Sequence, residues 1–217
     1  MYPIITGQLQ QKLAQPLPGT HAQFKMAHVG RSLIPKVPEH AKLASVLVLF
    51  YPKADHWHLV FIERNTSNTN DRHRGQIGFP GGKYEETDPD LMHTALREAQ
   101  EEVGVSIEQV HILGSLTSLY IPVSNFLVHP FVGITDTCPC FAAQESEVKN
   151  IIEIPYHWFF IPELTVVDKL QLSDQLTLQQ VPQFTIDGKI IWGATAMILS
   201  ELKEIIQPED FSTANIL

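Results

Sequence analysis

FPGGKYEETDPDLMHTALREAQEEVGV, residues 79–105, combines a glycine turn, a polar loop and a helix. The Pro-Gly-Gly at 80–82 predicts a tight turn, because glycine adopts backbone angles and close approaches that a side chain forbids. Apolar residues at helical spacing from Leu91 to Val103 predict a helix with one buried face. Gly104 follows as a left-handed cap would. The opposite face of this helix is therefore not needed for the core.

The start of the helix is predicted at Thr87 or Asp88, whose short polar side chains cap helix N-termini. Pro89 then falls in the first turn, where a missing backbone N–H is tolerated. Either cap leaves a short polar loop between the glycine turn and the helix.

Three carboxylates mark the other face of the helix. Glu98, Glu101 and Glu102 lie at i, i+3 and i+4, so their side chains point the same way. Hard oxygen ligands gathered like this suit Mg²⁺ or Mn²⁺. A solvated acidic surface is the alternative explanation for an isolated acidic helix. Arg97, immediately before these residues, and the glycine turn one loop earlier favour the metal site.

These residues resemble the Nudix box, whose pattern is G, five residues, E, seven residues and R-E-U-x-E-E-x-G-U, where U is a bulky aliphatic residue. Gly82 matches the first glycine, and residues 97–105, REAQEEVGV, match the second half. The intervening loop is one residue longer than the general pattern, Asp88 replaces the loop glutamate, and Ala99 is small for its place. The resemblance implies the α/β (α+β) class, as an α/β/α sandwich with a curved mixed sheet. It also implies metal-dependent hydrolysis of a nucleoside diphosphate linked to another group.

A second pattern resembles the coenzyme A pyrophosphatase branch of that family, whose substrates are coenzyme A and acyl-coenzyme A. The residues that match it or stand in register are Arg64, Ser67, Gly75, Gln76, 79–82, 119–122, 147–148 and 192–195. Asp71 departs from it, because the branch has an arginine there; Arg72 or Arg74 is close enough in sequence to take over. Hydrolysis of ADP-ribose, NADH or another dinucleotide is the alternative, and a non-catalytic nucleotide-binding regulator is a second.

The resemblance implies a role for each box residue. Glu98 and Glu102 would be the main ligands of Mg²⁺ or Mn²⁺. Glu101 would be a further ligand or would hold a metal-bound water, and the Gly82 carbonyl would complete the shell. Arg97 would orient a box carboxylate.

The general base and the substrate contacts are expected outside the helix. Glu147 is the preferred base; the alternatives are Glu145, His73, His129 and a box glutamate. The residues expected to bind substrate are Arg64, Arg72, Arg74, Gly81 and Gly82. The arginines are included because a guanidinium is the natural clamp for a phosphate.

Composition limits the partners. The chain has 217 residues, is 44% hydrophobic and carries a net charge of −9, which suits one sizeable core and argues against nucleic-acid or acidic-membrane binding. No apolar run approaches a membrane span. Cys138 and Cys140 fit unpaired thiols and indicate a cytoplasmic location. The expected partner is a small-molecule nucleotide, and a homodimer is left open.

Residues 1–40 are predicted to form an N-terminal arm that packs on the core, and residues 41–217 the Nudix hydrolase domain. Arg31 in the arm is long enough to reach a phosphate, but no motif assigns it one. A helix is expected at 4–13 and another at 193–206. Strands are expected at 44–51, 57–63, 76–79, 110–120, 126–134, 147–154, in two pieces over 166–178, and in a hairpin at 184–192.

Overall fold

The computed structural model describes residues 3–31, 36–65, 73, 75–173 and 176–211. The helices are α1 (Pro3–Leu13), α2 (Thr20–Gln23), α3 (Leu91–Val103) and α4 (Gly193–Ile205). The strands are β1 (Lys42–Lys53), β2 (His56–Arg64), β3 (Ile77–Gly78), β4 (Gly81–Lys83), β5 (His111–Ser115), β6 (Leu119–Ile121), β7 (Phe126–Ile134), β8 (Val148–Pro155), β9 (Thr165–Ser173), β10 (Leu176–Ile186) and β11 (Lys189–Trp192). Short 3₁₀ helices include η1 (Phe24–Met26), η2 (Val29–Arg31) and η4 (Tyr156–Phe160).

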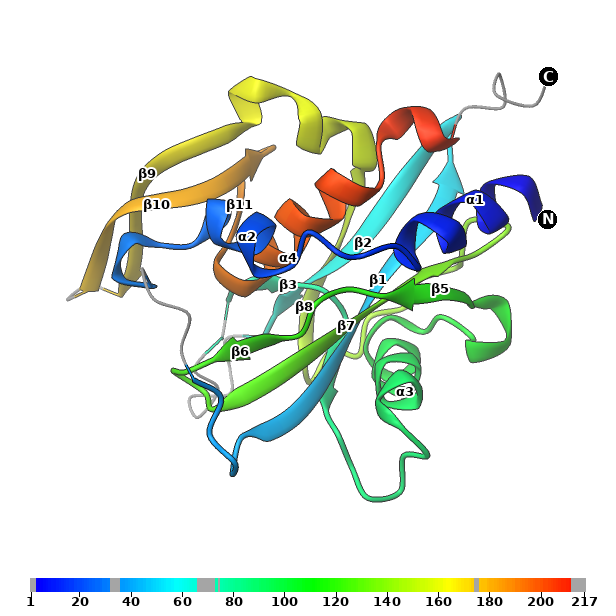
Figure 1. Cartoon of the computed structure of the whole chain (residues 1–217), viewed down its shortest axis with the longest axis horizontal. Helices are drawn as coiled ribbons and strands as arrows, with labels where there is room; N and C mark the ends of the chain where they lie inside the picture. Colours follow the sequence, from blue (N-terminus) through cyan, green and yellow to red (C-terminus); the bar gives the residue numbers. More distant parts are fainter. Residues whose placement is uncertain (1–2, 32–35, 66–72, 74, 174–175, 212–217) are drawn as a thin grey trace.

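A curved mixed sheet forms the centre of the molecule (Figure 1). Its strand order is β3-β2-β1-β7-β5, with β4 added to β1, β6 to β7 and β8 to β2. β1 and β7 run parallel, from Lys42 opposite Phe126 to Phe50 opposite Ile134. β1 pairs with β2 and β4 in the antiparallel sense. A smaller antiparallel sheet of β9, β10 and β11 lies beside α4.

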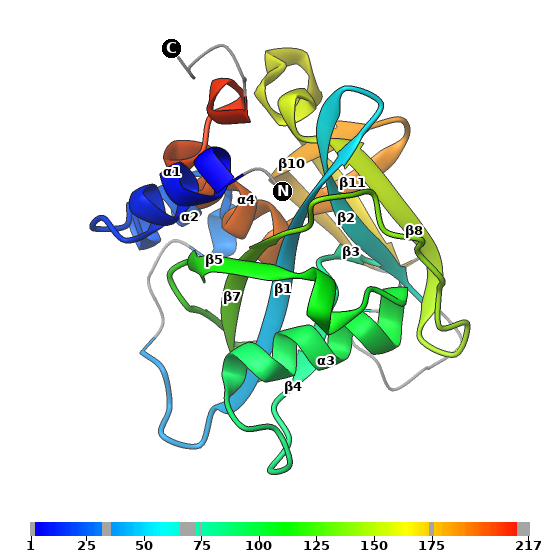
Figure 2. The ribbon, with the colours of Figure 1, turned by 90° about the vertical axis from the view of Figure 1, so that its right-hand side faces the viewer.

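Both faces of the central sheet are covered, as β1 shows. Leu47 and Leu49 pack in the cluster that includes α3, whereas Val48 and Phe50 pack in the cluster that includes α4. Successive side chains of a strand point to opposite faces, so burial on both faces explains the unbroken apolar run of this strand. Figure 2 shows α3 on one side of the sheet and α1, α2 and α4 on the other. The predicted α/β/α sandwich with a curved mixed sheet is confirmed.

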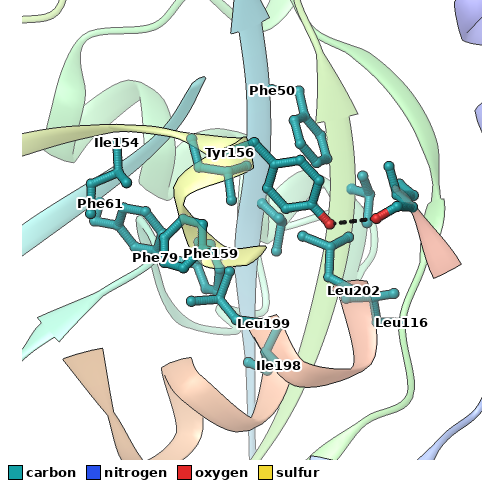
Figure 3. Packing of buried hydrophobic residues seen from close by; sticks show 14 of the residues in the cluster. Phe50, Phe61, Phe79, Leu116, Ile154, Tyr156, Phe159, Ile198, Leu199 and Leu202 are labelled. Carbon is teal, nitrogen blue, oxygen red and sulfur yellow. Dashed lines mark hydrogen bonds between the residues drawn. The ribbon is translucent and has the colours of Figure 1, made fainter. Parts of the chain in front are cut away.

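An aromatic cluster anchors the C-terminal end of α4 to the sheet (Figure 3). The rings of Tyr156 and Phe50 meet edge to face, with centroids 4.9 Å apart. The buried Tyr156 hydroxyl donates a hydrogen bond to the Ile206 carbonyl at 2.8 Å. A buried hydroxyl needs such a partner, so this bond fixes the residue that follows α4.

The N-terminal segment is tied to the core through one buried carboxylate. Glu201 of α4 is fully buried. It accepts hydrogen bonds from the Gly19 N–H at 3.1 Å, the Gln23 side-chain amide at 2.9 Å and the Thr117 hydroxyl at 2.6 Å. These bonds join α2, α4 and the connection between β5 and β6. The division into an arm at 1–40 and a domain at 41–217 stays a prediction.

One predicted strand is wrong. Residues 110–120 form two strands, β5 and β6, which pair with different halves of β7. Pro130 stands between those halves, and proline has no N–H to donate to a neighbouring strand. The Leu116 N–H donates a hydrogen bond to the Pro130 carbonyl at 2.9 Å. The chain then leaves the ladder, and Thr117 turns toward Glu201.

Other predicted elements are confirmed, with changed lengths at some ends. β7 and α4 occupy the segments expected for them, and the helix expected at 4–13 is α1. The hairpin expected around Asp187 and Gly188 is present, because both residues adopt positive φ angles of 48° and 73°. Its first strand, β10, begins at Leu176, which is earlier than expected.

Candidate active site

The helix that carries the carboxylates begins later than predicted. Asp90 caps α3, and its side chain accepts a hydrogen bond from the His93 N–H at 2.8 Å. The prediction of Thr87 or Asp88 as the cap is therefore wrong. Asp88 has another function: its buried side chain holds Arg97, and it accepts a bond from the Glu85 N–H at 3.0 Å.

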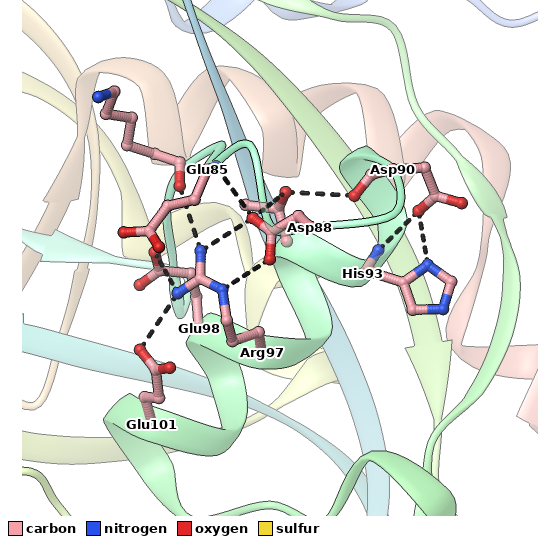
Figure 4. Close-up of polar contacts among 9 residues, drawn as sticks. Glu85, Asp88, Asp90, His93, Arg97, Glu98 and Glu101 are labelled. Carbon is pink, nitrogen blue, oxygen red and sulfur yellow. Dashed lines mark hydrogen bonds and ion pairs between the residues drawn. The ribbon is translucent and has the colours of Figure 1, made fainter.

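Arg97 is the centre of an ion-pair network on α3 (Figure 4). Its Nε lies 2.8 Å from Asp88 Oδ1, and its Nη1 lies 3.1 Å from Glu98 Oε1 and 3.2 Å from Glu101 Oε2. The guanidinium holds the pKa of Asp88 well below its usual range. Arg97 Nη2 also donates to the Lys83 carbonyl at 3.3 Å. The arginine thus orients carboxylates and ties them to the loop after the glycine turn.

Glu102 is a buried carboxylate with too little positive charge around it. Its side chain is 2% exposed, and Oε2 accepts a hydrogen bond from the Gly81 N–H at 2.8 Å. Arg64 Nη1 lies 3.7 Å from Oε1. Burial nevertheless raises the pKa of Glu102 to about 8. The protein surroundings alone therefore favour the neutral acid at neutral pH, whereas a cation at this position would favour the carboxylate.

Glu98 faces the glycine turn from the preceding helical turn. A Cβ built at Gly82 would lie 2.3 Å from the Glu98 carboxyl carbon, so only glycine leaves room for this carboxylate. Burial also raises the pKa of Glu98, although Arg97 opposes the shift. Glu98 and Glu102 are thus held against the same turn by close contacts with Gly82 and Gly81.

Glu101 and Glu147 lie at the open side of this cluster. The Glu101 side chain is 58% exposed. Glu147 is exposed in the turn immediately before β8, and its carbonyl accepts a bond from the Asn65 N–H at 2.7 Å. The charge of Glu147 raises the pKa of both Glu98 and Glu102, so the fold brings this later carboxylate near the helix. Among the causes of these two pKa shifts, Glu147 appears, whereas Glu145, His73 and His129 do not.

A cavity of about 330 Å³ adjoins the turn on the α4 side of the sheet. Arg64, Phe79 and Gly81 line it from the sheet, and Trp192 and Thr195 line it from the start of α4. The Thr195 hydroxyl donates to the carbonyl of Ile77 at 3.0 Å, which holds this end of α4 against β3. Two of the expected substrate contacts, Arg64 and Gly81, therefore border one cavity.

Two expected substrate contacts cannot be placed, and one residue that the sequence left without a role lines the cavity. Arg72 and Arg74 lie outside the described residues, as does Asp71. Arg31 of η2 lines the same cavity. No motif pointed to it, because only the folded chain brings the N-terminal segment to this place.

A family model for the NUDIX domain matches residues 41–175. The chain belongs to the Nudix family. An uncharacterized Nudix hydrolase, NudL, from Yersinia enterocolitica is 36% identical over 142 residues, which cover 61% of this chain and 67% of that relative. NudL from Yersinia pestis is 35% identical over 133 residues, and the match spans 65% of its length. The chain is thus a Nudix hydrolase.

Solved structures support the fold alone. The Nudix hydrolase RenU from M. smegmatis has a TM-score of 0.52 at 12% identity, covering 82% of this chain and 88% of that one. A MutT/nudix family protein from Enterococcus faecalis has a TM-score of 0.51 at 16% identity, covering 85% and 73%. At such identities the likeness carries no information about substrate.

The box residues of this Nudix hydrolase fit a divalent cation such as Mg²⁺. Among the residues that the structure describes, no three His, Cys, Asp or Glu side chains form a ready cage for a metal ion. Mg²⁺ needs no such cage, because it commonly takes one or two carboxylates and completes its shell with water and substrate phosphate. Glu98 and Glu102 supply such a pair. Burial raises the pKa of both carboxyl groups, so a bound cation would favour their charged forms.

Arg97→Ala is expected to lower kcat and weaken Mg²⁺ binding by about 10- to 100-fold, the scale for losing a residue that orients a metal ligand. Arg97 contacts Asp88, Glu98 and Glu101, and it is not among the residues that line the cavity. KM for substrate should therefore stay unchanged. Initial rates measured across a Mg²⁺ titration test this. A rise in KM alone would show that Arg97 holds substrate instead. Lys25→Ala, which removes an ion pair with Glu204, is the control.

Proposed function

We propose that this Nudix hydrolase cleaves coenzyme A or acyl-coenzyme A to 3′,5′-ADP and the corresponding 4′-phosphopantetheine, with Mg²⁺ or Mn²⁺. One observation carries the proposal. The buried carboxylate Glu102 and the mainly apolar cavity meet at Gly81 and Arg64. A substrate with a diphosphate joined to a long, mostly apolar arm would use both parts. The upstream residues that resemble the coenzyme A branch agree with this assignment.

The residues act on the diphosphate as follows. Glu98 and Glu102, with the Gly82 carbonyl, would hold the metal ion; Glu101 would be a further ligand or would bind one of its waters. Such an ion, when bound, neutralises phosphate charge and lowers the pKa of a coordinated water. Arg97 keeps the box carboxylates in place.

Glu147 would accept the proton of the attacking water at its carboxylate, and Arg64 would bind a phosphate oxygen. The oxygen of that water forms a bond to one phosphorus, and the bond from this phosphorus to the bridging oxygen breaks. The other phosphate leaves with that oxygen. A base within hydrogen-bond reach of the attacking water commonly contributes about 10²- to 10⁴-fold to the rate.

A dinucleotide such as ADP-ribose or NADH is the second candidate substrate. Asp71 favours it, because this residue stands where the coenzyme A signature has an arginine. A panel of these compounds with Mg²⁺ and with Mn²⁺, its products separated by chromatography, tests the proposal. Coenzyme A or an acyl-coenzyme A should be cleaved fastest. Faster cleavage of ADP-ribose or NADH would favour the second candidate. Binding without any cleavage would indicate a regulator.

Coenzyme A is expected to be cleaved about 10- to 100-fold faster, as kcat/KM, than its 3′-dephospho form. A charge-assisted hydrogen bond to phosphate contributes about 1.5–3 kcal/mol. Arg72 and Arg74 are the proposed partners of the 3′-phosphate, so Arg72→Ala or Arg74→Ala should shrink the preference. Lys36→Ala, a change elsewhere on the chain, serves as the control. Equal rates on the two substrates would instead support a dinucleotide as the natural substrate.

The expected partner is the small-molecule nucleotide itself, and a homodimer stays open. Cys138 and Cys140 are free and exposed, which agrees with the predicted cytoplasmic location. In the described part of the chain, no helix has both the length and the apolar character needed to cross a membrane.

A further inference from the structure

Arg31 is a half-buried cation at the end of η2, in the N-terminal segment. Its Nη2 donates a hydrogen bond to the Tyr120 carbonyl on β6. Its guanidinium lies over the Phe24 ring, 6.0 Å from the centroid. Its Nε is shielded from solvent and has no hydrogen-bond partner within the described ranges of the chain. The side chain is thus positioned by one carbonyl and one ring, and its Nε–H remains able to donate a hydrogen bond to a ligand.

Arg31 also has no counter-charge among the residues that the structure describes. Across the described residues, none of the ion pairs formed by Asp or Glu involves Arg31. Arg97, by contrast, contacts three carboxylates, and Arg64 lies beside Glu102. Withdrawing a charge from water without pairing it is unfavourable. Burial accordingly lowers the pKa of Arg31.

The cavity beside the glycine turn explains where a counter-charge would come from. Arg31 lines this cavity together with Arg64 and Gly81, the two residues that border the carboxylates of α3. Much of the remaining wall is apolar, including Trp192 and Leu172. A ligand that enters from the carboxylate side would therefore meet apolar walls and a second cation, separate from the one beside Glu102.

We propose that Arg31 binds an anionic group of the substrate other than the diphosphate that is cleaved. The inference rests on the proposed function, which supplies a substituted nucleoside diphosphate as the substrate. The group has two sources in that class: the 3′-phosphate of coenzyme A, which Arg31 would bind together with Arg72 or Arg74, or a carboxylate at the end of an acyl chain. Arg31 is then a specificity-determining residue contributed by the N-terminal segment, outside the matched NUDIX domain.

Two pairs of substrates that differ by one anion test this proposal. Coenzyme A is compared with 3′-dephospho-coenzyme A, and succinyl-coenzyme A with butyryl-coenzyme A. In one pair the wild-type enzyme should prefer the anionic member by about 10- to 100-fold in kcat/KM, the scale of one charge-assisted hydrogen bond. Arg31→Met should lower that ratio by about 10-fold, mainly by raising KM for the anionic member. Arg31→Lys should restore part of it. The pair that responds identifies the source.

A purely structural role for Arg31 gives a different result. Loosening of η2 from β6 would slow all four substrates alike and leave both ratios unchanged, which would overturn the proposal. So would a wild-type enzyme without preference in either pair. Lys25→Met is the matched control, because Lys25 is a neighbouring cation already paired with Glu204 at 2.8 Å. Thermal unfolding of each variant shows whether the segment stays packed.

Failure of the proposed function would look different again. The wild-type enzyme would cleave none of the four compounds but would cleave NADH or ADP-ribose. NADPH and NADH then form the test pair, because they differ by one phosphate, and the same loss of preference in Arg31→Met is expected. If nothing is cleaved, binding constants for the same pairs, measured with the Glu98→Gln variant, give the ratio without turnover. If the Arg31→Met change leaves the ratios of binding constants unaltered as well, the proposal is overturned.

Discussion

Glu98→Gln and Glu102→Gln are each expected to lower kcat by about 10²- to 10⁴-fold, the scale of losing a positioned catalytic group. Glutamine keeps the shape of glutamate but removes the ligand charge. The two carboxylates approach the glycine turn from successive turns of α3, Glu98 against Gly82 and Glu102 against Gly81. Rates at saturating Mg²⁺ are the measurement, and near wild-type turnover in either variant would contradict the ligand assignment.

Folding of the Glu102→Gln variant provides an independent readout. The folded-state pKa of Glu102, about 8, lies above its ordinary value of 4.5. The contribution of a raised carboxyl pKa to stability is complete below pH 4.5 and is lost as the pH rises toward 8. Without metal, Glu102→Gln should therefore melt higher than wild type at pH 8 to 9, and the gap should narrow near pH 5.

With Mg²⁺ at pH 8, the wild type should melt higher than Glu102→Gln, because a ligand that binds only the folded state stabilises it. The melting temperature of the wild type should rise with Mg²⁺ at pH 8, while those of Glu98→Gln and Glu102→Gln should stay nearly constant. Glu101→Gln is an informative comparison, since its side chain is 58% exposed and contacts Arg97 at the surface. A melting temperature that rises equally in all four proteins would place the ion elsewhere.

Local patterns in the sequence predicted much of the fold. The apolar run of β1, the hairpin at Asp187 and Gly188, and the helices α3 and α4 all follow from periodicity and turn chemistry. The two wrong predictions, the N-cap of α3 and the single strand at 110–120, arise where a residue elsewhere in the chain determines the local structure. Asp88 has the side chain of a cap, but Arg97 engages it, so the cap moves to Asp90.

The candidate site was predicted only where residues lie close in sequence. Spacing on α3 brought Glu98, Glu101 and Glu102 together, and the fold adds the charge of Glu147 close to Glu98 and Glu102. Their roles stay predictions. Spacing could not show that Glu102 is buried or that it accepts a hydrogen bond from the Gly81 N–H, because both follow from the fold. Nor could it reveal that Arg31 lines the cavity, because its contact with the Tyr120 carbonyl joins segments far apart in sequence.

Gly81→Ala is expected to destabilise the protein by about 2–5 kcal/mol, the combined scale of overpacking and backbone strain. Gly81 has a φ of 154°, where a side chain is strained. Its new Cβ would lie 2.3 Å from the Ser45 carbonyl oxygen and 2.6 Å from the Val46 Cα. Both are backbone atoms of the central strand β1, so neither can move aside. Denaturant unfolding, or loss of folded protein on expression, measures the effect.

The neighbouring change, Gly82→Ala, should lower activity while leaving stability nearly unchanged. Its Cβ would lie 2.3 Å from the Glu98 carboxyl carbon and 2.4 Å from Oε1. The end of a side chain can swing away, so the free energy of unfolding should change little. Activity should fall about 10²-fold, however, because displacing a catalytic group by about 1 Å can cost that much. A Gly82→Ala enzyme with wild-type kcat would show that Gly82 does not set the position of Glu98. A Gly81→Ala protein as stable as wild type would show that β1 makes room for the added Cβ.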